Sequence, residues 1–425
     1  MRILAGVPLR TAKQRPYRAR RSKNTRALSF RLKGSWSDLG LIYLDNAATS
    51  FPKPRCVYEA AIRCIERDCG NAGRGSHPLA LASAKRIYDC REAICRHFDA
   101  DDPLRVVFTL NTTYALNFLL KGILKQGDHV LISDMEHNAV LRPLQRLAAD
   151  GRITYDTFPT MSDSGAYPPL RLCGRIAELC RPNTRAIVCS HQSNLCSATL
   201  PLKEIGEFCH RHGLLFLVDV AQSAGHLPIT LRKNHIDALC APGHKGLLGL
   251  QGCGFCLLGE RIHPDTLIEG GSGYQSLSPD MPDEYPERGE AGTLPTPAIT
   301  SLAAGIGAIE RLGIEAIGAH EQALFRALHE RLESLEGYRI YLPQISGSTL
   351  LLSRQGILAD RIGAYLGDRG ICVRSGYHCA ALGHGTLQTP EGGAVRVSFG
   401  PFNTLGNVEA LFSTLRRMEF LHEVE

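Results

Sequence analysis

Two residues near the middle of the chain have the types and the spacing to bind opposite ends of one aromatic ring. Asp219 ends the apolar run "LLFLVD", and Lys245 follows the next apolar run inside the glycine-flanked segment "GHKG". A buried carboxylate is costly unless a cation pairs with it, so Asp219 suits a protonated ring nitrogen. A desolvated lysine amine can form a Schiff base with an aldehyde. The ordinary alternatives are a helix N-cap for Asp219 and a solvated loop position for Lys245.

A third segment has the groups that an anion needs. Asn111, Thr112 and Thr113 lie between the strand-like run "RVVFTL" and a stretch with helical spacing. Free N–H groups at a helix N-terminus, together with hydroxyls, favour a phosphate. Simple N-capping explains the same three residues equally well, so this segment points to a phosphate only in combination with the others.

Three further polar residues follow predicted strands. His137, in "EHNAV", has a flat ring that could lie on the face of a cofactor. Asn194, in "HQSN", suits a ring hydroxyl, and Gln222 lies one turn after Asp219, where it could donate to a neighbouring oxygen. Each of them alone would more often be an ordinary surface or capping residue.

One of the fifteen cysteines stands apart from the others. Cys379 lies in "RSGYHCA", a polar segment past a predicted strand, with Arg374 and His378 close to it in sequence. A nucleophilic thiol must be reachable and deprotonated, and positive neighbours favour the thiolate. By contrast, Cys253 and Cys256 form a CxxC inside an apolar strand without a second pair at zinc-ligand spacing, so we expect them to be buried. Cys372 is expected in the core as well.

The elements that position these residues alternate between strand-like and helix-like runs. Continuous apolar runs of strand length begin near residues 105, 128, 152, 185, 214 and 236, and helical stretches such as 202–213 separate them. This alternation predicts an α/β fold with a mostly parallel sheet that is buried on both faces. Ligands bind such a sheet at the carboxyl ends of its strands, where the polar residues described above fall.

The chain divides into three parts on this interpretation. Residues 1–40 form a basic extension that we expect to be disordered, and residues 56–294 form a large ligand-binding domain. Residues 295–425, with 41–55, are predicted to form a smaller α+β domain, beginning with a long helical region from Pro295 to Glu336. A segment of residues 56–69 before Gly70 is predicted to be helical.

Composition excludes several classes of protein. The chain of 425 residues is 44% hydrophobic and 21% charged, as in ordinary globular enzymes, and it has no apolar run of the roughly 18 residues that cross a bilayer. Scattered cysteines favour a reducing cytoplasm.

Eleven Lys or Arg residues lie within residues 1–37, and without them the net charge of +6 becomes −5. The basic extension could be a transit-type peptide, a disordered tail or a start site assigned too far upstream.

Nine motifs, in order, resemble one enzyme family. They are "YLDNAAT", "GRGSH", "NTTYALN", "EHNAV", "SN", "DVAQ", "GHK", "GTLPTPA" and "RSGYHCA". Together they resemble the class V aminotransferase superfamily of pyridoxal 5'-phosphate enzymes, specifically the cysteine desulfurases of the short-loop kind that includes selenocysteine lyases. The resemblance covers about residues 41–420. It implies a fold-type-I transferase, whose large domain has a mostly parallel seven-stranded sheet, with a smaller α+β domain.

The resemblance also implies roles for individual residues. Lys245 would hold the cofactor, Asp219 would pair with its ring nitrogen, and His137 would stack on its ring. The residues implied at the hydroxyl are Asn194 and Gln222, and those at the phosphate are Thr112, Thr113 and His244. Thr293 matches a residue that reaches the phosphate of the other subunit, which implies a homodimer. The implied catalytic set is Cys379, Lys245 and His137.

The implied substrate is L-cysteine. Arg396 matches the arginine that clamps the substrate carboxylate, with Arg374 and Asn194 beside it. The implied products are L-alanine and a persulfide on Cys379, which passes to an acceptor protein or a small thiol. We expect no metal, membrane or nucleic-acid partner.

The chain departs from its relatives at three positions, and alternative functions stay open. Pro242 replaces a serine that often binds the phosphate, and Asn111 and Tyr114 replace a glycine and a glutamate. L-selenocysteine is the alternative substrate, as for a selenocysteine lyase. Another class V reaction, such as transamination, would make Cys379 incidental. A sulfur carrier without catalysis, or a nucleic-acid binder that uses the basic extension, belongs to a different class.

Overall fold

The computed structural model describes residues 40–73, 75–162, 165–341 and 347–418. The basic extension is predicted for residues 1–40; residues 1–39 of it, and with them the prediction that it is disordered, lie outside the described residues. Within the described part of the chain, no helix combines the length and the apolar character needed to cross a membrane.

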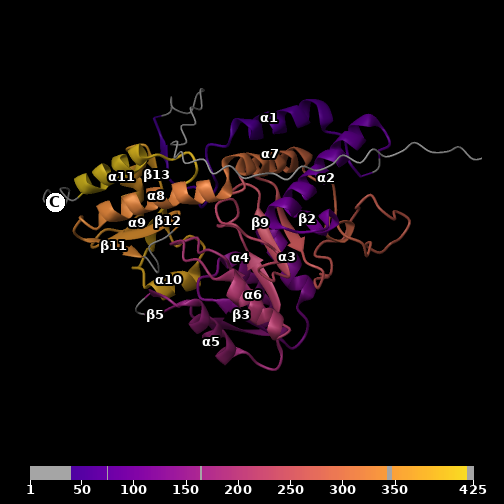
Figure 1. Cartoon of the computed structure of the whole chain (residues 1–425), viewed down its shortest axis with the longest axis horizontal. Helices are drawn as coiled ribbons and strands as arrows, with labels where there is room; N and C mark the ends of the chain where they lie inside the picture. Colours follow the sequence, from indigo (N-terminus) through magenta and orange to yellow (C-terminus); the bar gives the residue numbers. More distant parts are fainter. Residues whose placement is uncertain (1–39, 74, 163–164, 342–346, 419–425) are drawn as a thin grey trace, which may run out of the picture. The chain divides into compact units, whose positions relative to one another are not determined.

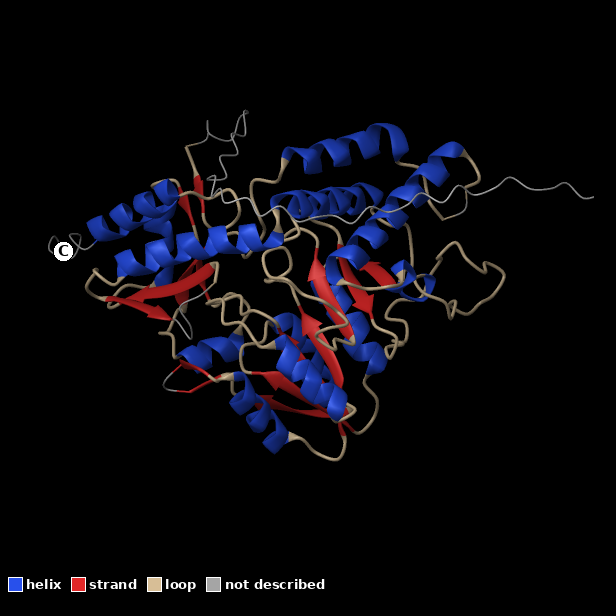
Figure 2. Ribbon diagram, viewed as in Figure 1, coloured by secondary structure: helices blue, strands red, loops and turns tan. Residues whose placement is uncertain are grey.

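A seven-stranded sheet forms the centre of the larger part of the fold (Figures 1 and 2). Its strands in spatial order are β2 (Val106–Thr109), β10 (Gly254–Leu258), β9 (Ala238–Pro242), β8 (Leu215–Asp219), β7 (Thr184–Ser190), β3 (Asp128–Ser133) and β4 (Ile153–Phe158). Only β10 runs antiparallel to its two neighbours among these strands. The predicted mostly parallel α/β sheet is therefore confirmed.

The strands read as continuous apolar runs because both faces of the sheet are covered. Leu131 belongs to one hydrophobic core, whereas Val130 and Ile132 on either side of it belong to another. This alternation follows from the period of two residues along a strand. Each face of the sheet therefore has its own core.

Helices cover the two faces of the sheet. Those that contribute to the first core are α2 (Pro78–Phe98), α5 (Pro169–Leu179), α6 (Leu202–Arg211), α7 (Thr296–Leu312) and, through Ile317, the start of α8 (Ile314–Leu332). Those that contribute to the second core are α3 (Thr112–Ile123) and α4 (Asn138–Ala149). The predicted helix over residues 56–69 is α1 (Arg55–Arg63), which continues into a π-helical turn, Cys64–Asp68.

A second sheet lies in the C-terminal part of the chain. Its antiparallel strands in spatial order are β11 (Tyr338–Tyr341), β12 (Thr349–Arg354), β15 (Ala394–Ser398) and β14 (Arg374–Gly376). Near the N-terminus β1 (Ile42–Tyr43) pairs with β13 (Ile371–Cys372). A third core joins these elements to α8 (Ile314–Leu332), α9 (Ala359–Gly367) and α11 (Leu405–Met418). The exact domain boundaries stay a prediction.

The remaining elements are short, and one expected helical region is divided. The short elements are β5 (Met161–Ser162), β6 (Gly165–Ala166), α10 (Ala381–Leu387) and two 3-10 turns, Pro103–Arg105 and Glu287–Gly289. The helical region predicted from Pro295 to Glu336 consists of two helices, α7 and α8. Gly313 separates them at a φ of 84°, a conformation that glycine adopts without the strain of a side chain.

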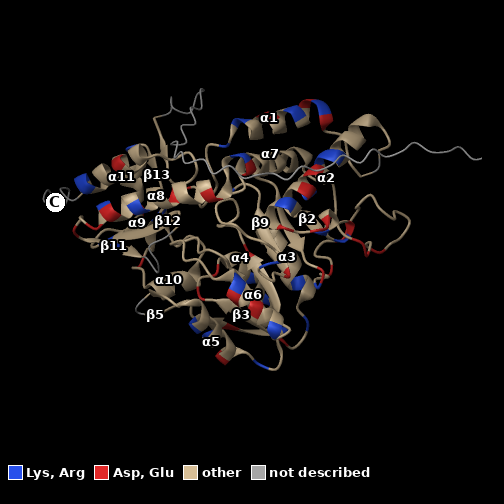
Figure 3. Cartoon of the chain, in the orientation of Figure 1, with Lys and Arg blue, Asp and Glu red and all other residues tan. Residues whose placement is uncertain are grey.

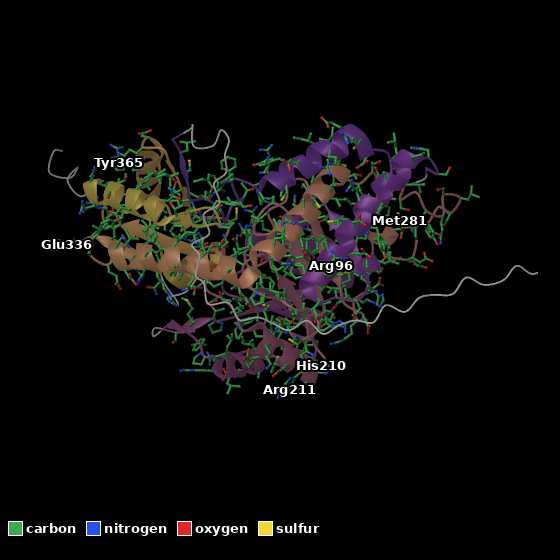
Figure 4. All side chains as sticks on the ribbon, turned by 45° about the horizontal axis from the view of Figure 1, so that its top comes forward. Arg96, His210, Arg211, Met281, Glu336 and Tyr365 are labelled. Atoms are coloured by element: carbon green, nitrogen blue, oxygen red, sulfur yellow. The ribbon has the colours of Figure 1, made fainter. Side chains whose placement is uncertain are left out.

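Basic residues lie in the last turns of two helices that precede strands of the large sheet. Arg96 near the end of α2, and His210 and Arg211 at the end of α6, are basic residues in last helical turns that precede the strand starts (Figure 4). Such cations are favourable at helix C-termini. Elsewhere the charged side chains gather mostly on helices and loops (Figure 3). The polar residues predicted from the sequence lie at the other ends of the strands, their carboxyl ends.

Candidate active site

A cavity of about 240 Å³ lies at the carboxyl ends of β2, β3, β7, β8 and β9. The strand ends are level there, because Ser190 pairs with Asp219 and Asp219 pairs with Cys240 in the register of the sheet. The predicted residues that line this cavity are Thr112, Thr113, His137, Asn194, Asp219, Gln222, His244 and Lys245. The structure therefore brings these eight side chains together around one space.

The charged groups of this cavity are Asp219, which is buried, and Lys245, which is half-buried. Burial raises the pKa of Asp219, although the Ala221 N–H that donates to Oδ1 at 2.9 Å and the nearby Lys245 both oppose the rise. Burial lowers the pKa of Lys245 to about 8, and Asp219 opposes that change. An amine with a pKa near 8 has a neutral, nucleophilic fraction at neutral pH.

The loop that carries Lys245 is fixed by the segment that follows β1. The carbonyl oxygen of His244 accepts hydrogen bonds from the Ser50 N–H at 3.1 Å and from Lys53 Nζ at 2.5 Å. Ser50 Oγ also donates to the Lys245 carbonyl oxygen at 2.8 Å. Gly246 is needed for close packing, since a Cβ there would lie 1.9 Å from the Ala224 carbonyl oxygen. The sequence analysis did not predict these contacts of residues 50–53.

The N-terminus of α3 forms one end of the cavity. Asn111 Oδ1 accepts a hydrogen bond from the Tyr114 N–H at 3.1 Å and so caps the helix. Within the described residues, the buried Thr112 Oγ1 has no hydrogen-bond partner. A buried hydroxyl without a partner at a helix N-terminus is suited to an anion.

His137 is a neutral imidazole held in place by its neighbours. Its Nδ1 accepts a hydrogen bond from the Ala139 N–H at 3.0 Å, and burial, followed by the charge of Lys245, lowers its pKa to about 4. The preceding Glu136 is fully buried and accepts hydrogen bonds from the Ser190 N–H at 2.9 Å and the Ser190 hydroxyl at 2.9 Å. Glu136 therefore ties the turn before His137 to the end of β7.

Asn194 connects the cavity with the segment that carries Cys379. Its Nδ2 donates to the His378 carbonyl oxygen at 2.8 Å. The backbone carbonyl oxygen of Asn194 accepts from Arg396 Nη1 at 3.1 Å. The buried Oδ1 of Asn194 has no partner among the described residues. One amide side chain thus contacts the thiol segment while leaving its oxygen available to a ligand.

Cys379 is presented at the tip of a tight turn. The thiol residue is exposed, and the turn closes with a hydrogen bond from the Ala380 N–H to the Tyr377 carbonyl oxygen at 3.1 Å. His378 and Cys379 have φ values of 50° and 56°, the pattern of a type I′ turn, which usually contains Gly or Asn. The Asn138 N–H donates to the Cys379 carbonyl oxygen at 2.7 Å. The nucleophile predicted from the sequence therefore lies on a held backbone.

The surroundings of the thiol differ from the expectation in one respect. His378 Nε2 contacts the Ala394 carbonyl oxygen at 3.0 Å, and burial lowers the pKa of His378 to about 3. The ring is therefore neutral near pH 7 and adds no positive charge beside Cys379. The sequence showed that a histidine is adjacent but not that its ring is desolvated.

Arg396 and Arg374 share one carboxylate. Asp45 Oδ1 accepts from Arg396 Nη2 at 2.8 Å, and Asp45 Oδ2 accepts from Arg374 Nε at 3.1 Å. Among the described residues, the buried Nε of Arg396 has no partner. The sequence analysis did not single out Asp45, although it lies within the quoted motif "YLDNAAT". Its place between two predicted substrate-binding arginines becomes visible only in the fold.

Thr293 lies away from the cavity that holds Lys245. It lines a separate cavity of about 560 Å³, together with residues of α2 and of the segments around residues 71–73 and 271–273. The prediction that Thr293 acts on another subunit is consistent with this position but is not tested by it.

The other cysteines are free thiols. Cys253 and Cys256 are fully buried, as predicted, and Cys256 Sγ lies 3.7 Å from Cys240 Sγ. Cys372 is half-buried rather than in the core, because it lies on the short strand β13. All fifteen cysteines are in the described part of the chain, and none forms a disulfide there.

Comparison with known proteins identifies the family. The model of the family described as aminotransferase class-V matches residues 42–411. A probable cysteine desulfurase of Methanothermobacter thermautotrophicus is 32% identical over 386 residues, covering 89% of this chain and 94% of that protein. A cysteine desulfurase of Escherichia coli (strain SE11) is 28% identical and covers 90% and 94%, respectively.

Solved structures agree with the sequence comparison. The apo structure of a cysteine desulfurase from Thermococcus onnurineus NA1 has a TM-score of 0.81 at 30% identity, covering 89% of this chain and 94% of that one. The cysteine desulfurase CsdA from Escherichia coli has a TM-score of 0.80 at 26% identity, covering 91% and 96%. The chain belongs to the class V aminotransferase family, and the relatives it matches there are cysteine desulfurases.

Proposed function

We propose that this protein is a pyridoxal 5'-phosphate-dependent cysteine desulfurase, which converts L-cysteine into L-alanine and a persulfide on Cys379. The observation that carries the proposal is the connection through Asn194. This residue contributes to the cavity of Lys245 and Asp219 and also holds the turn of the exposed Cys379. The thiol is thus exposed to an acceptor, and its turn is tied to the cavity through Asn194.

The residues of the cavity suit the proposed cofactor. Lys245 and Asp219 would hold the aldehyde and the ring nitrogen, and the neutral ring of His137 would lie on the ring face. The buried Thr112 Oγ1 and Asn194 Oδ1 are two polar atoms without partners in the described residues, as expected if a phosphate and a ring hydroxyl complete them. When bound, pyridoxal phosphate supplies an electron sink for the bonds at Cα.

The protein's own groups would perform the remaining work. The Arg396 guanidinium, with its unpartnered Nε, would hold the substrate carboxylate. The Lys245 amine, with its pKa near 8, would move the proton at Cα. The Cys379 thiolate would attack the substrate sulfur while the Cβ–S bond breaks, so that sulfur stays on Cys379 as a persulfide.

The assembly and the acceptor form part of the same proposal. We propose a homodimer in which Thr293 of each subunit contacts the phosphate bound by the other, since Thr293 lies outside the Lys245 cavity of its own chain. The persulfide would pass to a thiol of an acceptor protein or a small molecule. Fifteen free thiols support a reducing compartment, and we propose the cytoplasm.

A spectral and product assay tests the function. The purified protein should be yellow, and addition of L-cysteine should yield alanine and, with a thiol reductant, sulfide. Replacement of Lys245 by Ala should abolish both the colour and the products. If the protein instead transaminates, and the C379A variant transaminates equally well, the proposal of desulfuration is contradicted. Comparing turnover of L-cysteine with that of L-selenocysteine decides between the two substrates.

A further inference from the structure

A buried glutamate and a buried histidine face each other behind Lys245. Glu321 on α8 and His226, in the segment after β8, are both almost fully buried, with exposed fractions of 4% and 8%. Glu321 Oε2 lies 3.6 Å from His226 Nδ1. Neither residue has a role in the proposed function as described above.

A chain of hydrogen bonds fixes which nitrogen of His226 carries the proton. The Thr199 hydroxyl donates to the Ser197 carbonyl oxygen at 2.9 Å, so Thr199 Oγ1 can accept from Gln192 Nε2 at 3.0 Å. The amide oxygen of Gln192 is thereby directed to His226 Nε2, at 3.0 Å. An amide oxygen accepts only, so His226 Nε2 carries the hydrogen.

At 3.6 Å Glu321 Oε2 and His226 Nδ1 are in contact but beyond hydrogen-bond distance, so their charges decide which of the two groups carries a proton. With the hydrogen on Nε2, a neutral His226 presents a lone pair at Nδ1 toward Glu321. An ionised Glu321 would present a second acceptor there, and two acceptors that face each other in a buried site repel. One proton between them removes the conflict. Burial alone raises the pKa of Glu321 to about 8 and lowers that of His226 to about 4, which places the proton on Glu321 at neutral pH.

The couple borders the same small space as the catalytic amine. Glu321, His226, Gln222 and Lys245 line a second cavity of about 30 Å³, and Lys245 also lines the larger cavity of the candidate site. A space of this size accommodates a water molecule, and these four side chains offer it several polar partners. The other side chains of the small cavity are uncharged. The titratable groups nearby are Asp219, which interacts with Lys245, the buried His191, which interacts with His226, and Lys53, which is hydrogen-bonded to Ser50.

We propose that the Glu321–His226 couple is a proton store for Lys245, reached across the small cavity. This inference rests on the proposed function. When the Cβ–S bond breaks, its electron pair stays on Cβ, which takes up one proton; the Cys379 thiol loses one proton when the S–S bond forms. The number of protons taken up equals the number released, but uptake occurs at Cβ and release at the Cys379 thiol. Glu321 donates its proton to Lys245 and is protonated again afterwards. It therefore acts through Lys245, as a positioning residue and not as a catalytic one.

The E321Q variant separates this role from a merely structural one. Glutamine has the same size, and its amide N–H can still donate to His226 Nδ1, so the contact is kept while the acidic proton is lost. E330Q, at an exposed position of the same helix, is the matched control. Infrared difference spectra of the purified proteins between about pH 6 and pH 10 should show a buried carboxylic-acid carbonyl band that disappears with a midpoint near 8 in the wild type and in E330Q. E321Q should lack that band.

Turnover supplies the second measurement. E321Q should lower kcat for alanine formation by about tenfold or more with KM unchanged, and the pH profile of kcat should lose the ionisation attributed to Glu321. Burial also raises the pKa of Glu136 to about 7, so all three proteins should share a band with that midpoint. A band with a midpoint near 8 retained in E321Q, or an E321Q variant with the kcat and pH profile of the wild type, would overturn the inference. A wild-type protein that forms no alanine from cysteine would instead refute the proposed function, and the infrared band alone would then decide whether Glu321 holds a proton.

Discussion

Asp45 and Arg396 form a buried ion pair in which Asp45 Oδ1 accepts from Arg396 Nη2 at 2.8 Å. The second oxygen of Asp45 accepts from Arg374, so one carboxylate separates two guanidinium groups. The residue proposed to bind the substrate carboxylate is therefore already oriented by an internal carboxylate. Asp45 occupies Nη2 of Arg396, and Nε has no partner among the described residues. The substrate carboxylate should therefore bind on the Nε side of this guanidinium.

Removing the charge of Asp45 should weaken both stability and substrate binding. In D45N two arginines would face each other without a compensating charge, and breaking a buried pair in this way costs about 3–5 kcal/mol. We expect D45N to lower the free energy of unfolding by an amount at the low end of this range, since Arg374 is half exposed. We also expect KM for L-cysteine to rise about tenfold. Urea unfolding and steady-state kinetics measure the two effects.

D89N is the control for that substitution. Asp89 forms an exposed i,i+4 pair with Lys85, so its loss should change stability by less than about 0.5 kcal/mol and leave KM unchanged. Equal effects of D45N and D89N would contradict the positioning role of Asp45.

Persulfide should form on Cys379 and on no other thiol. After incubation with L-cysteine and alkylation, mass spectrometry should find the added sulfur on the peptide that contains Cys379. C379S should abolish sulfide release in the presence of a reductant. Cys69 is also exposed but lies on another part of the chain, so C69S should keep full activity. Sulfide release by C379S at the wild-type rate would refute the assignment of the nucleophile.

Thr293 should act across the subunit interface. K245A and T293V are each expected to have little activity, because each lacks a group of the cofactor site. A hybrid dimer of one K245A and one T293V subunit would contain one intact site, formed by Lys245 of one chain and Thr293 of the other. Mixing the two variants under conditions of subunit exchange should therefore restore activity. If Thr293 served its own chain, both sites of the hybrid would stay defective and no activity would return.

Lys53 should make stability depend on pH above neutrality. Burial lowers the pKa of Lys53 to about 7 from 10.5, so between these values the unfolded chain binds more protons than the native protein. Stability therefore rises with pH through this window, by up to about 1.4 kcal/mol per pH unit. K53M removes the titrating group, so the stability of the wild type relative to K53M should increase from pH 7 to pH 10. Urea unfolding at several pH values measures the slope.

K85M tests whether that slope is specific. Lys85 is exposed and its side chain pairs with Asp89 on the surface, so the difference between K85M and the wild type should be nearly constant over the same pH range. A flat difference for K53M as well would show that Lys53 is not desolvated.

The sequence was most informative where local pattern decides structure. Each predicted strand of the large sheet is present, because continuous apolar runs such as residues 214–219 can be stable only where both faces are covered. Asp219 and Lys245 could be placed at neighbouring strand ends because successive strands of a parallel sheet usually lie side by side. The family and the mostly parallel fold predicted from the sequence are confirmed.

The contacts that hold the site depend on distant parts of the chain and have no local signal. Asp45 meets Arg396 across 351 residues, and Glu321 meets His226 from a helix that belongs mainly to a different core. In the sequence each of these is a single polar residue in an ordinary context. Likewise, "YHCA" gives only a weak signal of left-handed backbone at His378 and Cys379, since histidine is enriched in that conformation but cysteine is not.

The left-handed tip bears on how sulfur leaves the protein. Non-glycine residues persist in that conformation only while their surroundings hold them, and here three bonds do so, from Asn138, from Asn194 and to Ala394. Loss of these bonds would let two peptide units relax toward commoner torsion angles and shift the exposed sulfur. Such a rearrangement involves only the four residues of the turn, with both sheets at rest.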